Sequence, residues 1–108
     1  MKNGIPQITV KELKRRIDAG EDVCILDVRE PGEYQIAQIG GKLIPQKEVP
    51  NRLAEIDRDR EIIVHCRSGV RSQKIAELLQ QAGYPRVANL AGGILAWSEE
   101  IDPSVKKY

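Results

Sequence analysis

Residues 61–72 read EIIVHCRSGVRS, and in them a short apolar run passes directly into a polar loop that contains a cysteine. A short, nearly continuous apolar run is typical of a strand buried on both faces, as in a parallel sheet. Beyond the loop, apolar residues recur at helical spacing until Gly83, which can end a helix. The segment therefore predicts a strand, a loop and a helix in that order, as in a βαβ unit.

Apolar runs and helical patterns alternate over the rest of the chain as well. Such an alternation predicts an α/β domain with a mainly parallel central sheet flanked by helices. Besides the unit above, the predicted strands cover residues 23–28, 43–44 and 86–90, and the predicted helices cover residues 9–20, 50–56 and 94–100.

Length and composition indicate one small globular domain. The chain has 108 residues, of which 41% are hydrophobic and 31% charged, so wholesale disorder is excluded. We expect a single domain over residues 1–108, with its core over about residues 6–101 and a loosely ordered C-terminal tail. The net charge of +1 gives no support for nucleic-acid or membrane-surface binding, so neither is expected as a partner.

Few special residues are available for chemistry. Two Cys and one His cannot make a four-ligand zinc site or a disulfide framework, so we expect no metal and no cofactor. No apolar run reaches the ~18–20 residues of a membrane span, and the N-terminus lacks the apolar core of a signal peptide. A reducing, cytoplasmic location is therefore expected.

Cys66 stands where the predicted strand enters the loop, one short turn before the helix. Ligands of open parallel sheets bind at this edge, and the free N–H groups and positive dipole of a helix start favour an anion. Gly69 allows successive N–H groups to converge, and Arg67 and Arg71 add two charges. These features favour the thiolate over the thiol, whose ordinary pKa is about 8.5. We therefore predict that Cys66 is a nucleophile, not a buried structural cysteine, which is the commoner role.

Cys24 offers an internal comparison. It lies within the apolar run of residues 23–28 and has no basic neighbour in the sequence, so we interpret it as a small core residue. A disulfide between Cys24 and Cys66 is conceivable across neighbouring strands, but a reducing compartment argues against it.

Three motifs resemble the signatures of rhodanese domains. Residues 27–34, DVREPGEY, resemble the N-terminal signature, and residues 66–72 resemble the active-site loop. Residues 92–97, GGILAW, resemble the C-terminal Gly-Gly-x-x-x-Trp signature. The order and rough spacing match the family, so the resemblance covers nearly the whole chain and implies a single rhodanese-like domain.

The resemblance implies a sulfurtransferase that works through a cysteine persulfide. Cys66 would take a sulfane sulfur from thiosulfate, another small anionic donor or a protein persulfide, and pass it to a nucleophilic acceptor. The N–H groups of the loop would surround the outer sulfur, and Arg67 and Arg71 would bind the anionic donor. For Arg29, a solvated surface charge is the alternative to a supporting role. The implied substrate-binding residues are Arg67, Ser68, Gly69, Val70 and Arg71, and the implied loop supports are Asp27, Arg29 and Ser72.

One stretch departs from the family pattern. Residues 38–42, QIGGK, replace a frequent His-Ile-Pro-Gly-Ala and are apparently one residue shorter, which leaves the local turn open. Residues 92–108 resemble the end of the C-terminal rhodanese domain in fused molybdopterin-synthase sulfurylases, which form thiocarboxylates on small carrier proteins. The implied protein partners are a sulfur carrier or a cysteine desulfurase, and the chain is a stand-alone protein, a relic or an excised piece.

Two alternatives belong to other functional classes. Residues 65–72 resemble the His-Cys-(x)5-Arg-Ser signature of cysteine phosphatases, but only four residues separate Cys66 from Arg71. The smaller ring suits one sulfur atom, and no loop offers the carboxylic acid that phosphatase chemistry needs. The other alternative is a non-catalytic rhodanese-like binding or regulatory module, whose mark would be the loss of Cys66.

Overall fold

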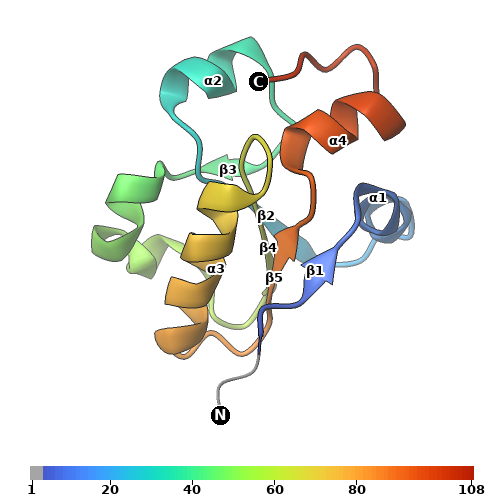
Figure 1. Cartoon of the computed structure of the whole chain (residues 1–108). Helices are drawn as coiled ribbons and strands as arrows, with labels where there is room; N and C mark the ends of the chain where they lie inside the picture. Colours follow the sequence, from blue (N-terminus) through green and yellow to red (C-terminus); the bar gives the residue numbers. More distant parts are fainter. Residues whose placement is uncertain (1–3) are drawn as a thin grey trace.

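The computed structural model describes residues 4–108 and contains one parallel sheet with helices on both faces (Figure 1). Its five strands lie in the order β1-β5-β4-β2-β3, and every neighbouring pair is parallel. The predicted α/β architecture is confirmed. The strands are β1 (Gln7–Ile8), β2 (Val23–Asp27), β3 (Lys42–Leu43), β4 (Glu61–His65) and β5 (Val87–Leu90).

The helices begin where the local sequence supplies the right cap or backbone. Thr9 precedes the first helix, and its hydroxyl accepts a hydrogen bond from the N–H of Glu12 (3.1 Å), as the capping pattern predicted. The Glu12 carboxylate binds Arg15 and does not complete the capping box. The helices are α1 (Val10–Asp18), α2 (Pro31–Ile36), α3 (Val70–Gln81) and α4 (Gly93–Glu100), with the 3₁₀ helices η1 (Gln46–Asn51) and η2 (Leu53–Glu55).

The central strand β4 divides the hydrophobic core into two layers. Its side chains alternate, so Ile62 and Val64 join the cluster that contains residues of α3 and η1. Ile63 points to the opposite face and joins the cluster of α1 and α4, which includes Leu13 and Trp97. Because both faces of β4 are buried, the continuous apolar run of the sequence is explained.

Three elements differ from the sequence predictions. The helix predicted over residues 50–56 is wrong, because Pro50 lies inside η1 and the segment forms two short 3₁₀ turns. The Tyr84 hydroxyl lies within hydrogen-bond distance of the carbonyl oxygens of both Leu53 and Ile56, so tertiary contacts hold these turns. Helix α2 was not predicted, although proline at the first helical position favours a helix start. Strand β1 is too short to leave a periodic pattern.

The carboxyl ends of β2 and β4 lie side by side, with Asp27 opposite His65 in the register. Helix α2, the loop before α3 and the start of α4 gather at this end of the sheet (Figure 1). At the C-terminus, Val105 packs against the α1 and α4 layer, and the loosely ordered tail stays a prediction. Residues 1–3 of the predicted domain range lie outside the described residues, and within residues 4–108 no helix is long and apolar enough to span a membrane.

Candidate active site

Cys66 lies inside the loop that joins β4 to α3, one residue past the end of the strand. The residue is only 1% exposed. Its Sγ accepts a hydrogen bond from the N–H of Gly69 (3.1 Å) and lies 3.4 Å from the hydroxyl oxygen of Ser72. The loop therefore closes around the sulfur atom, as an anion nest does.

The loop lowers the pKa of the Cys66 thiol below its ordinary value. Burial alone would raise this pKa, because a buried thiolate loses its hydration. The Ser72 hydroxyl and the N–H groups of Ser72, Gly69 and Ser68 together outweigh burial, because they donate hydrogen bonds to the charged sulfur. This direction agrees with the predicted shift toward the thiolate, but these loop donors are its main cause, and neither arginine is among the largest contributors.

The N–H groups of the loop converge because its carbonyl groups are held on the other side. Helix α4 donates the N–H of Ile94 to the carbonyl oxygen of Cys66 (3.1 Å) and the N–H of Leu95 to that of Arg67 (3.1 Å). In a trans peptide the N–H points opposite to the C=O, so the N–H groups of Arg67 and Ser68 face away from α4 and into the loop. The start of the last helix thus orients these two donors of the nest.

Two glycines permit this geometry for different reasons. Gly93 has a φ of 56°, and a Cβ atom there would lie 2.5 Å from the carbonyl oxygens of both Cys66 and Arg67. A side chain at Gly93 would therefore separate α4 from the loop. Gly69 has a φ of 107° but space for a Cβ, so only its backbone conformation requires glycine, as predicted.

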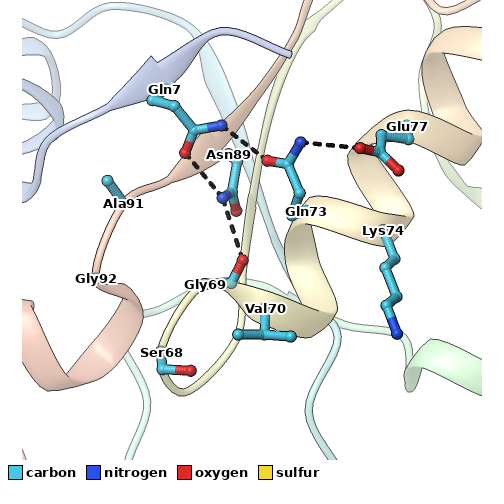
Figure 2. Close-up of a pocket in the computed structure, with 10 residues that line it drawn as sticks. All are labelled: Gln7, Ser68, Gly69, Val70, Gln73, Lys74, Glu77, Asn89, Ala91 and Gly92. Carbon is cyan, nitrogen blue, oxygen red and sulfur yellow. Dashed lines mark hydrogen bonds between the residues drawn. The ribbon is translucent and has the colours of Figure 1, made fainter. Parts of the chain in front are cut away.

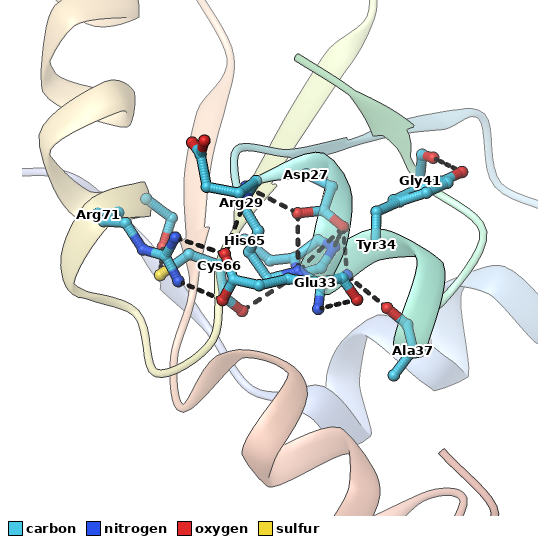
Figure 3. A network of polar contacts seen from close by, with 11 residues as sticks. Asp27, Arg29, Glu33, Tyr34, Ala37, Gly41, His65, Cys66 and Arg71 are labelled. Atoms are coloured by element: carbon cyan, nitrogen blue, oxygen red, sulfur yellow. Dashed lines mark hydrogen bonds and ion pairs between the residues drawn. The ribbon is translucent and has the colours of Figure 1, made fainter. Parts of the chain in front are cut away.

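Arg71 binds Glu33 of α2 through both terminal nitrogens, with Nη1–Oε1 2.8 Å and Nη2–Oε2 3.0 Å (Figure 3). The bond to Arg71 holds the pKa of the Glu33 carboxyl below its usual range, so the carboxylate is charged at neutral pH. The other arginine of the loop, Arg67, is exposed, and within residues 4–108 its side chain forms no ion pair. The two arginines therefore present their charges differently.

Asp27 and Arg29 form an ion pair in which both side chains are 0% exposed. Arg29 donates to Asp27 through Nη2 (2.7 Å) and Nε (2.9 Å), which excludes the solvated surface charge considered for Arg29. Nη2 also donates to the carbonyl oxygen of Ala37 (2.7 Å), so the pair anchors the end of α2 to β2. Within residues 4–108 the pair makes no hydrogen bond to the loop, and Nη1 of Arg29 lies 3.5 Å from the carbonyl oxygen of Glu33 in α2 (Figure 3).

His65 lies between this ion pair and Cys66, fully buried at the end of β4. Its Nε2 is 3.5 Å from Oδ2 of Asp27, and its Nδ1 is 3.3 Å from the carbonyl oxygen of Cys66. Burial lowers the pKa of His65 below its ordinary value, so the ring is neutral at neutral pH. Only Nδ1 has a hydrogen-bond partner, the carbonyl oxygen of Cys66, whereas the buried Nε2 has none among residues 4–108.

Cys24 has a different environment. It lies opposite Ile62 in the register of β2 and β4, near the other end of the sheet, and it is half-buried. Burial raises the pKa of its thiol, in contrast to Cys66. Both cysteines are free thiols.

Two polar residues near the loop were not predicted. Glu33 belongs to the motif over residues 27–34, and that membership was its only signal in the sequence. Asn89 is buried on β5, and its side chain binds the hydroxyl of Ser72. A polar residue inside an apolar strand is costly unless it is hydrogen-bonded, which was the available signal for Asn89.

Comparison with known proteins identifies the family of this chain. The family model described as the rhodanese-like domain matches residues 9–100. The chain belongs to the rhodanese-like family. A solved rhodanese-like domain protein from Staphylococcus aureus superposes with a TM-score of 0.83 at 34% identity, covering 90% of this chain and 95% of that chain. A rhodanese-related protein from Thermoplasma volcanium has a TM-score of 0.81 at 33% identity, covering 89% and 93%.

Relatives of this rhodanese-like domain carry sulfur-transfer names. A protein named sulfurtransferase from Allochromatium vinosum is 39% identical, and the match covers 94% of this chain and 95% of that protein. The probable adenylyltransferase/sulfurtransferase MoeZ of Mycobacterium tuberculosis is 35% identical over 94% of this chain, but the chain spans only 26% of MoeZ. These relatives support sulfurtransferase activity in general.

Proposed function

We propose that this rhodanese-like protein transfers a sulfane sulfur through a persulfide on Cys66. The observation that carries the proposal is the convergence of the Gly69 N–H and the Ser72 hydroxyl on a buried Sγ whose pKa is lowered. Such a site favours a nucleophilic thiolate and can also bind the anion that the thiolate becomes. Cys24 lacks this environment, because its thiol pKa is raised.

The first half-reaction loads the enzyme. The Cys66 thiolate attacks the outer sulfur of thiosulfate, a new S–S bond forms, and the original S–S bond breaks as sulfite leaves with its electron pair. In the second half-reaction a nucleophile such as cyanide takes the outer sulfur, and the Cys66 thiolate is restored. No proton, metal or external electron is required in either step.

In this proposal some loop residues bind the sulfur and others bind the donor. The N–H groups over residues 67–71 surround the outer sulfur of the persulfide, and α4 orients those of Arg67 and Ser68. Arg67 attracts the anionic donor from solvent, and Arg71 engages its oxygens, because a guanidinium can bind two oxygens at once. The Ser72 hydroxyl donates a hydrogen bond to the sulfur of Cys66, and Asp27 and Arg29 hold the end of α2 in place.

The physiological donor and acceptor are proposed by chemical class. A small anionic sulfane donor such as thiosulfate fits the cationic loop. A protein persulfide, as on a cysteine desulfurase, is the other proposed donor. A sulfur-carrier protein is the proposed acceptor, by analogy with relatives such as the putative sulfur carrier protein YrkF of Bacillus subtilis. We place this exchange in the cytoplasm, where a reducing environment keeps Cys66 free.

Mass spectrometry tests the proposal directly. Incubation with thiosulfate should add one sulfur atom, about 32 Da, to the peptide that contains Cys66, and cyanide should remove it. Cys66→Ser should abolish thiosulfate:cyanide transfer, whereas Cys24→Ser should retain most of it. Equal losses from the two substitutions would reject Cys66 as the sulfur carrier. A wild-type protein that never gains the sulfur would instead favour the non-catalytic binding module.

A further inference from the structure

Asn89 lies on β5 behind the loop and is 4% exposed. Its Nδ2 donates to the carbonyl oxygen of Gly69 (3.2 Å) and to Oε1 of Gln7 (3.0 Å) (Figure 2). Its Oδ1 lies 2.5 Å from the hydroxyl oxygen of Ser72. Asn89 therefore connects the outer side of the loop with the hydroxyl that faces Cys66.

The partners of Asn89 fix the orientation of its amide group. The carbonyl of Gly69 can only accept a hydrogen bond. Gln7 uses its own Nε2 to donate to Gln73 (2.8 Å), so the Oε1 that it turns toward Asn89 is an acceptor (Figure 2). Both contacts require the NH₂ group of Asn89, which leaves the amide oxygen for Ser72.

Ser72 has one hydroxyl proton and two acceptors within reach. The hydroxyl oxygen is 2.5 Å from Oδ1 of Asn89 and 3.4 Å from Sγ of Cys66. The proton can be donated to only one of them at a time. When Cys66 is a neutral thiol, the hydroxyl donates to Asn89, which is the shorter contact. When Cys66 is a thiolate, the hydroxyl donates to the sulfur, because hydrogen bonds to charged acceptors are stronger.

We propose that Asn89 is a positioning residue that competes with Cys66 for the hydroxyl proton of Ser72. Its consequence for catalysis rests on the sulfur-transfer function proposed above. In the free enzyme the Ser72 hydroxyl donates its hydrogen bond to the Cys66 thiolate. In the persulfide the negative charge lies on the outer sulfur, so the hydroxyl donates to Asn89 instead. The position of one proton thus distinguishes the loaded from the unloaded enzyme.

The charged groups around Cys66 are the same in every variant of the test below, so they contribute equally to both backgrounds, including Arg71, whose charge is coupled to that of Cys66. Helix α4 has no acidic residue in its first turn, and β5 carries no charged residue. The remaining groups lie on β2, α2, β4, the loop and α3. They are the pairs Asp27 with Arg29 and Glu33 with Arg71, neutral His65, exposed Glu30, Arg67 and Lys74, and Glu77, which binds Gln73.

Alkylation of Cys66 across a pH range, read from its peptide mass, tests the proposal. Ser72→Ala should raise the titration midpoint by about one pH unit, because the thiolate loses a hydrogen bond. Asn89→Ala removes the competitor but also loosens the contact with Gly69. We therefore compare Asn89→Ala alone with Asn89→Ala in the Ser72→Ala background, where only the loosening remains. The midpoint change caused by Asn89→Ala should be more negative when Ser72 is present.

Equal changes in the two backgrounds, or a more positive change when Ser72 is present, would overturn the proposal. Gln73→Ala, at the outer end of the same amide chain, is the matched control and should keep the wild-type midpoint. The Cys24 peptide reports folding in each sample, because unfolding exposes this half-buried thiol to the reagent. If Asn89→Ala does not fold, Asn89→Ser replaces it, since the shorter side chain still withdraws the acceptor. The titration needs no sulfur donor, so its outcome is independent of persulfide formation.

Discussion

Glu33 and Arg71 lie 38 residues apart in the chain and form a two-point ion pair beside the sulfur site. The guanidinium proposed to bind the donor is thus already occupied by a carboxylate of the same protein. An anionic donor must share Arg71 with Glu33 or displace it. With side-chain exposures of 31% for Arg71 and 22% for Glu33, water weakens the pair only in part. We therefore expect Glu33 to compete with the donor for Arg71.

Replacing Glu33 should strengthen donor binding. We expect Glu33→Gln to lower the KM for thiosulfate about two- to fivefold, as for the loss of a competing ion pair worth ~0.5–1 kcal/mol. Arg71→Ala should raise the same KM. Steady-state thiosulfate:cyanide kinetics of both variants provide the measurement. If Glu33→Gln raised the KM as much as Arg71→Ala, Glu33 would orient the guanidinium instead of competing for it.

The same ion pair makes folding stability depend on pH. Folding lowers the pKa of Glu33 below 4.5, so its stabilising contribution is complete above that pH and is lost as the pH falls through the folded value. Glu33→Gln should lower the free energy of unfolding by ~0.5–1 kcal/mol at pH 7. It should leave that free energy nearly unchanged at a pH where the wild-type carboxyl is protonated. Urea unfolding in a double-mutant cycle with Arg71→Ala, at neutral and at acid pH, isolates the pair. A coupling energy that is unchanged in acid would contradict this assignment.

Arg67 should act by long-range attraction. Because it is exposed and has no ion-pair partner within the described chain, Arg67→Ala should lower kcat/KM for thiosulfate mainly at low ionic strength. Added salt should narrow the difference from wild type. Lys74→Ala removes an equal charge from α3, further from Cys66 in the chain, and should have the smaller effect. A deficit of Arg67→Ala that persists at high salt would indicate direct contact with the donor.

Gly93 should tolerate no side chain. The left-handed backbone alone costs alanine about 1–2 kcal/mol, and contact with the carbonyl groups of Cys66 and Arg67 adds to this cost. Gly93→Ala should also misalign the loop donors, each worth ~10²–10³ in kcat when well aimed. Gly32→Ala is the control, since a Cβ there meets nothing within 4 Å and the residue lies in α2. Thermal unfolding and transfer kinetics should separate the two variants. Similar behaviour of the two would contradict the role of α4 in orienting the loop donors.

Loop length should separate sulfur transfer from phosphate chemistry. Wild type should not hydrolyse an aryl phosphate, because the ring from Cys66 to Arg71 is one residue short of a phosphatase loop. The nearby carboxyl of Glu33 is no proton donor either, since its pKa is lowered. One glycine inserted between Gly69 and Val70 should weaken sulfur transfer without producing phosphatase turnover. Cys66-dependent phosphatase activity in wild type, without a persulfide mass, would overturn the functional assignment.

Local sequence predicted the parts of the site that lie within one segment. Cys66, Gly69 and the helix start are close in the chain, so their spacing alone predicted a nest. Glu33, Asn89 and the N–H groups of α4 reach the loop only through the order of the strands, which no local pattern encodes. The same reason explains Arg29, because its burial depends on how α2 folds over the end of β2.

The hydrogen bonds that α4 donates to the loop have a consequence for biosynthesis. A ribosome makes Cys66 well before it makes Ile94 and Leu95, whose N–H groups turn the loop donors inward. In a nascent chain that ends before α4, we expect the N–H groups of Arg67 and Ser68 to lack this orientation, so the loop gains its full set of donors only when the last helix docks. We therefore expect a chain that terminates before α4 to take up less sulfur on Cys66 than the full chain.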